Sequence, residues 1–152
     1  MYTAVLILHS WLRWGVFAAG LTAIYTALTT RPVVGGEGPA DRWGLAFMVT
    51  LDLQMLLGLL LYLVLSPNTT AMFADFGAAM RDPVARFWAV EHVGTMLIAV
   101  VLVHVGRVLA RRATSAASKR TRVLICFVAA MVAVVVATPW PGLANGRPLF
   151  RV

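Results

Sequence analysis

Four long apolar segments constrain this chain more than any other feature of its sequence. A helix of roughly 20 residues crosses the hydrocarbon core of a bilayer. With 61% hydrophobic residues, the chain is also more apolar than an average soluble domain, which has about 45–50%. We therefore expect an all-α fold, a single domain over residues 1–152 that forms an antiparallel four-helix membrane bundle with short loops. The four apolar segments cover roughly residues 3–29, 43–65, 86–110 and 122–139.

A shorter and more polar stretch, residues 68–83, separates the second and third segments. Within it Met72, Phe76 and Met80 recur every four residues, which places them on one face of a helix. We expect a short amphipathic helix that lies on the outer membrane surface. An irregular loop is the alternative.

Basic residues are concentrated between the third and fourth segments, where residues 107–122 contain no acid. The positive-inside rule places this loop in the cytoplasm, so four crossings leave both termini outside. We interpret the net charge of +7 as a sign of membrane topology and of contact with anionic lipid, not with nucleic acid. The basic residues are Arg107, Arg111, Arg112, Lys119, Arg120 and Arg122.

Two histidines fall at a similar depth in different segments. His9 lies about 10 Å below the outer surface, and His92 lies about 9 Å below the start of its segment at Arg86. Two histidines level with each other on facing helices are typical axial ligands of one haem. Hydrogen bonds between helices, metal transfer and a proton relay are the alternatives.

Three arginines are candidate partners for the propionate groups of such a haem, because Arg binds carboxylates with two parallel hydrogen bonds. They are Arg13, Arg86 and Arg147. Gly20 follows His9 on the same helical face, where a residue without a side chain would let a flat macrocycle approach the backbone.

His104 lies twelve residues beyond His92, about 18 Å deeper in the membrane. Met48 is its only candidate co-ligand at that depth, and His/Met pairs do ligate haem iron. We expect one haem and not two. The roles left open for His104 are a second cofactor site, proton or quinone binding, and a hydrogen bond to another helix.

Asp52 and Gln54 lie in the middle of the second segment, and Glu91 lies beside His92. A carboxyl group at membrane depth must pair or be neutral. The candidate partners of Asp52 are an inward-facing arginine and Glu91 through a shared proton. Asp52 and Gln54 then belong to a proton path or a quinone site, or they hydrogen-bond a neighbouring helix. Glu91 either orients a histidine on another helix or reaches water.

Four stretches give the chain a resemblance to a known family. They are LHSWLRW, DLQMLLGLLLY, FWAVEHVGTMLIAVVLVHVGR and the tail PWP…GRPLFR. Together they resemble small bacterial four-helix membrane proteins labelled cytochrome-b-like. The resemblance implies a multi-pass protein of the bacterial cytoplasmic membrane whose histidines, here His9 and His92, hold haem b, with His104 as a further candidate. Better-known members supply four histidines and two haems, whereas this chain has three histidines.

The expected function is therefore that of a one-haem, b-type cytochrome-like subunit that transfers electrons in a respiratory chain, with quinol as a candidate donor. We expect an electron-transfer or anchor subunit and not a stand-alone enzyme. Its expected partners are the lipid bilayer and either a larger membrane complex or further copies of itself. The alternatives are a cofactor-free accessory subunit and a copper-handling membrane protein, because copper-resistance D-type proteins share the four-helix size.

Overall fold

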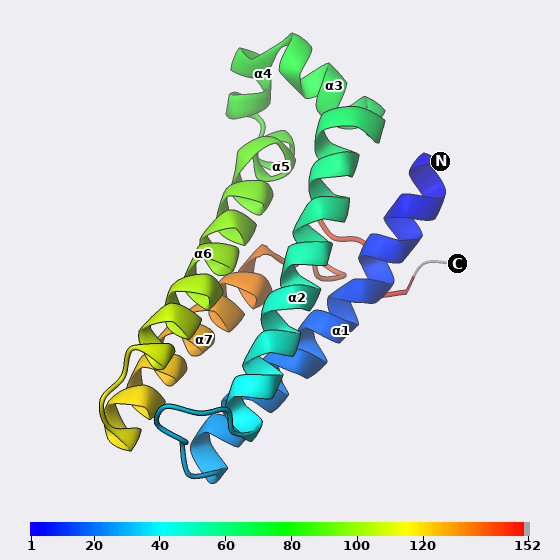
Figure 1. The fold of residues 1–152 in the computed structure, drawn as a ribbon. Coiled ribbons are helices and arrows are strands. Elements are labelled where there is room, and N and C mark those ends of the chain that lie inside the picture. Colours follow the sequence, from blue (N-terminus) through cyan, green and yellow to red (C-terminus); the bar gives the residue numbers. More distant parts are fainter. Residues whose placement is uncertain (151–152) are drawn as a thin grey trace.

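The structure, a computed structural model that describes residues 1–150, is a bundle of four long helices without strands in this range (Figure 1). This confirms the predicted all-α bundle. The second and third long helices each contain one π-helical stretch, η1 and η2. In order, the long helices are α1 (Tyr2–Thr29), α2 with η1 (Pro39–Leu60, Leu61–Leu65), α5 with η2 and α6 (Pro83–Arg86, Phe87–Glu91, His92–Arg111), and α7 (Ala116–Ala137).

The fourth helix begins at Ala116, before the predicted start at residue 122. Ser115 explains this start, because its side chain accepts a hydrogen bond from the Ser118 amide and so caps the helix. The first turns of α7 are helical but polar, so the apolar run that predicts the helix begins only after them.

Two short helices connect the second and third long helices at one end of the bundle, where one helix was predicted. They are α3 (Pro67–Ala74) and α4 (Phe76–Arg81). The helix is interrupted at Asp75, whose side chain accepts a hydrogen bond from the Ala78 amide and caps α4. The aromatic rings of Phe73 and Phe76 stack across this break.

The core lies where the four long helices meet. Phe47 from α2 and Phe127 from α7 are both almost completely buried, and their rings meet edge to face with centroids 5.6 Å apart. Small residues allow this packing: a side chain at Gly20 would collide with Phe47 and Met131. Gly20 is therefore part of the core, and the expectation that it faces a macrocycle is wrong.

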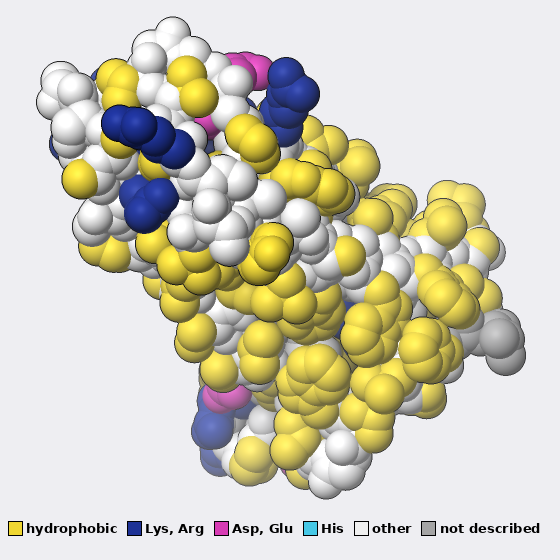
Figure 2. All heavy atoms as spheres, turned by 90° about the horizontal axis from the view of Figure 1, so that it is seen from below, with side chains coloured by type: hydrophobic (Ala, Val, Ile, Leu, Met, Phe, Trp, Pro, Cys, Tyr) yellow, Lys and Arg dark blue, Asp and Glu magenta, His cyan; other side chains and the backbone are white. Residues whose placement is uncertain are grey.

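All four long helices are long and apolar enough to cross a membrane, so this is a multi-pass membrane protein. Leucine and valine side chains remain exposed along their outer faces, as lipid contact requires. Lysine and arginine gather at the end where residues 30–38 and 112–115 connect the helices, which we call the basic end. Figure 2 views the molecule from this side and shows basic side chains beside a largely hydrophobic surface.

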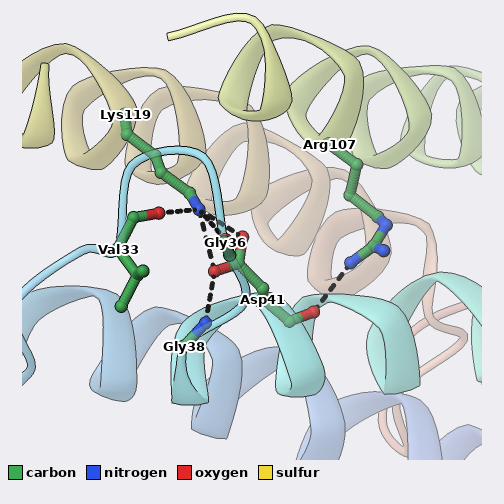
Figure 3. A network of polar contacts seen from close by, with 6 residues as sticks. All are labelled: Val33, Gly36, Gly38, Asp41, Arg107 and Lys119. Carbon is green, nitrogen blue, oxygen red and sulfur yellow. Dashed lines mark hydrogen bonds and ion pairs between the residues drawn. The ribbon is translucent and has the colours of Figure 1, made fainter. Parts of the chain in front are cut away.

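A buried ion pair holds the basic end together (Figure 3). The ammonium group of Lys119 lies 2.9 Å from the carboxylate of Asp41, with 6% and 16% of the two side chains exposed. Lys119 also donates to the carbonyls of Val33 and Gly36, so it ties α7 to the loop before α2. Arg107 from α6 donates to the carbonyl of Asp41, which brings a third helix into the network.

Candidate functional site

A cavity of about 350 Å³ lies inside the bundle, in the half away from the basic end. Its volume falls within the range of about 300–1,000 Å³ that is usual for small-molecule sites. All four long helices, α3 and the C-terminal tail contribute to its walls. Most of the lining is apolar, and the principal polar groups on it are His9, Gln54, His92, Arg13 and Arg147.

His92 reaches the cavity from the start of α6, and its ring orientation is fixed. Its Nδ1 lies 2.8 Å from the carbonyl oxygen of Ala137, at the end of α7. Because a carbonyl can only accept, Nδ1 carries the proton and donates it, which leaves the lone pair on Nε2. The rings of Phe87 and Trp88 also contact the imidazole. Such an outer hydrogen bond is the usual way in which a protein orients a histidine that binds a metal.

His9 reaches the same cavity from α1, so the structure brings the two histidines together as their depths predict. Its ring packs directly against Gly58 of α2, where an added Cβ atom would lie only 3.1 Å from Cε1. The backbone of His9 is held as well, because the side chain of Gln54 donates to its carbonyl at 2.9 Å. Gly58 and Gln54 therefore set the position of His9 from the neighbouring helix.

Three buried polar atoms around the cavity have no hydrogen-bond partner among residues 1–150. They are Nδ1 of His9, Oε1 of Gln54 and Nε1 of Trp88. Leaving a buried polar group unsatisfied costs about 1–3 kcal/mol, so native proteins pair such groups with protein, water or ligand. These three atoms give the cavity unused hydrogen-bonding capacity, which water or a polar ligand can satisfy.

The C-terminal tail carries one arginine of the site, Arg147, and contacts the other, Arg13 of α1. Arg13 donates to the carbonyl oxygen of Leu149 at 2.6 Å, and Phe150 stacks on Trp14. Arg147 lines the cavity with its guanidinium group 4.9 Å from the centre of the Trp88 ring, a cation–π contact. Two of the three predicted arginines, Arg13 and Arg147, therefore lie at the cavity.

Arg86 and Glu91 do not take part in the site. They form an ion pair with each other at 2.7 Å, and almost half of each side chain is exposed. Arg86, predicted as a partner of a haem propionate, therefore lies outside the cavity, and Glu91 bonds Arg86 and not a histidine. The carbonyl of Ala137 orients His92 instead, which a search of side chains in the sequence could not find.

Asp52 and His104 also lie outside the cavity, on the outer surface of the bundle. The carboxylate of Asp52 lies 3.5 Å from Nε2 of His104. The candidate partners predicted for Asp52, an inward arginine or Glu91, are therefore wrong. Met48 packs against the hydrophobic core, and Nδ1 of His104 bonds the carbonyl of Val100.

The two π-helical stretches, η1 and η2, both lie at the cavity end of the bundle. Tyr62 of η1 lines the cavity and donates from its hydroxyl group to the carbonyl of Ala89 in η2, which links the two stretches directly. Thr69 of α3 donates in turn to the carbonyl of Tyr62. Such π-helical turns occur frequently at functional sites, and here both stretches contribute residues to the cavity wall.

The fold and the cavity define a class, that of multi-pass membrane proteins with two histidines facing one internal cavity. Comparisons with protein-family models, with curated proteins and with solved structures give no match for this chain. The function is therefore argued from the site.

Proposed function

We propose that this protein is a b-type cytochrome-like subunit of the membrane that binds one haem b between His9 and His92. The proposal depends above all on one observation: the two imidazoles, from α1 and α6, line the same largely apolar cavity. When bound, the haem would supply an iron atom that takes up and releases one electron. Two histidine ligands would leave the iron no position for oxygen, so the haem would serve electron transfer.

The surrounding residues support this assignment by what they do to the two histidines and to the charge of the cavity. The bond from His92 Nδ1 to Ala137 leaves Nε2 as the nitrogen that would bind iron. Gly58 leaves room for the ring of His9. The guanidinium groups of Arg13 and Arg147 supply positive charge for the two propionates.

The set of metal-binding side chains around the cavity favours haem over copper. Within residues 1–150, no three His, Cys, Asp or Glu side chains lie together in a way that could hold a metal ion. Two histidines are enough for haem, because the porphyrin supplies four nitrogen ligands of its own. The remaining alternative, a cofactor-free accessory subunit, is separated from the proposal by the absorption spectrum.

The test is the visible spectrum of the full chain, purified from membranes of cells that have ample haem and measured oxidised and reduced. We expect the sharp reduced bands of a low-spin haem. His9→Ala and His92→Ala should each abolish them, whereas His104→Ala, the matched control outside the cavity, should keep them. Wild-type protein without haem would overturn the proposal, and so would loss of the bands in His104→Ala with retention in His9→Ala.

A further inference from the structure

A second polar pair, Asp52 of α2 and His104 of α6, lies on the outer surface of the bundle. About 35% of the Asp52 side chain and 45% of the His104 side chain are exposed. Neither residue lines the cavity, so the proposed haem site does not account for them. Residues that face outward from a membrane bundle ordinarily contact lipid tails, which offer no hydrogen bonds.

Both residues lie deep in the membrane-spanning part of the chain. Asp52 is midway between Pro39 and Leu65, the two ends of its span, so it lies about 20 Å from each end at 1.5 Å per residue. His104 lies about 10 Å from the end of its own span at Arg111. Insertion measurements put the cost of an aspartate at the centre of a membrane helix at about 2.5–3.5 kcal/mol. Such residues almost always face the interior of a bundle or an aqueous cavity.

The contact between the two side chains does not satisfy them. The 3.5 Å separation between His104 Nε2 and Asp52 Oδ2 exceeds the usual range of about 2.7–3.2 Å for such a hydrogen bond. His104 Nδ1 is already engaged with the carbonyl of Val100 at 3.0 Å. In the part of the chain that the structure describes, no side chain or backbone group donates a hydrogen bond to Asp52. The carboxyl group therefore retains most of its capacity to accept hydrogen bonds.

The surface around the pair has the pattern of a helix-packing face. Exposed apolar residues recur at spacings of three and four along both helices, with Asp52 or His104 in the middle of each row. The rows run side by side, because α2 and α6 are in contact. On α2 the row is Leu45, Val49, Leu53 and Leu56, and on α6 it is Leu97, Val101, Val105 and Val108.

We propose that this face is the interface with a second copy of the same chain. The pair consists of one acceptor and one imidazole side by side, so the surface is complementary to itself. A two-fold axis next to the pair would bring Asp52 of each copy to His104 of the other, which is the arrangement of an isologous dimer. Because Nδ1 of His104 donates to Val100, the carboxyl oxygen of Asp52 and Nε2 of His104 would share one proton across the interface. Hydrogen bonds between polar side chains are an established source of helix association in membranes. The apolar rows would pack around the two pairs and exclude lipid.

The experiment is a charge-exchange test with the full chain in lipid nanodiscs, read out as the number of copies per particle. Wild type should contain two copies. Asp52→His should place histidine against histidine, and His104→Asp should place aspartate against aspartate, so each variant alone should give one copy. When the two variants are expressed together under different affinity tags, each Asp again meets a His across the interface, and mixed dimers should form.

The control pair carries the same two tags on Ile125→His and Ile125→Asp, because Ile125 is an exposed position on α7 outside this face. Those chains should dimerise like wild type, with or without each other. Circular dichroism verifies that every variant is folded. One copy per wild-type particle overturns the proposal, and so does wild-type association with a different membrane protein. Wild-type dimers with no mixed dimers from the two pair variants also overturn it.

Discussion

Replacing Lys119 with methionine should destabilise the bundle by about 3 kcal/mol. The ammonium and carboxylate groups are 2.9 Å apart. Coulomb's law gives about 6 kcal/mol for unit charges at that distance and an effective dielectric constant near 20. Desolvation offsets part of this energy, and removal of one partner from a buried pair typically costs about 3–5 kcal/mol. We expect the lower end, because Asp41 keeps the hydrogen bond from the Gly38 amide.

The assay is thermal unfolding of purified protein in one detergent, followed by circular dichroism. At about 2–4 °C per kcal/mol for a chain of this length, Tm should fall by about 6–12 °C. Methionine keeps the length of the lysine side chain, so the loss reports the charge and its hydrogen bonds. Arg112→Met is the matched control, since Arg112 is an exposed cation at the same end of the bundle. It should change stability by no more than about 0.5 kcal/mol.

A double-mutant cycle with Asp41→Asn isolates the pair from the rest of the network. If the two residues act together, Lys119→Met with Asp41→Asn should cost clearly less than the sum of the two single changes. A Lys119→Met protein within 1 kcal/mol of wild type would refute the reasoning. Additive losses would also refute it, because they would mean that Lys119 acts through the carbonyls of Val33 and Gly36 and not through Asp41.

Two further predictions concern the site and the topology. Gly58→Ala would place a Cβ atom 3.1 Å from Cε1 of His9, so it should weaken or shift the haem spectrum. Gly94→Ala, with open space around the added atom, should leave that spectrum unchanged. If Gly58→Ala also leaves it unchanged, Gly58 does not set the position of His9. In a background without other cysteines, Ser115→Cys at the basic end should react with an impermeant reagent only after intact cells are opened, whereas Thr70→Cys on α3 should react from outside. The reverse pattern would invert the bundle in the membrane.

The number and approximate positions of the long helices could be predicted because their cause is local. An apolar run of membrane length forms a helix, since backbone groups in lipid must be paired within the segment. The same regularity made depth predictable: a rise of 1.5 Å per residue put His9 and His92 at one level, and both line one cavity. The short connecting region between α2 and α6 was harder to predict, because the break between α3 and α4 depends on the single capping side chain of Asp75.

The lateral partners of the polar residues could not be predicted, because they depend on how each helix is rotated and on backbone groups far away in the sequence. His92 is oriented by the hydrogen bond that it donates to the carbonyl of Ala137. A backbone acceptor of this kind cannot be recognised from residue types. The support of His9 comes from the absence of a side chain at Gly58. The tail that carries Arg147 reaches the cavity only because the chain folds back after α7.

Depth and direction together decide what each polar pair in this bundle requires. His9 and His92 face inward, and the unpaired atoms beside them border a cavity, so a ligand of limited size can satisfy them. Asp52 and His104 lie outside that cavity, on the outer surface of the membrane-spanning helices, where lipid offers no hydrogen bonds. A small ligand in the cavity does not reach that second pair, which is why we propose that a second copy of the chain covers it. The two proposals thus follow from one requirement, the pairing of polar groups in a medium without water, applied to opposite sides of the same helices.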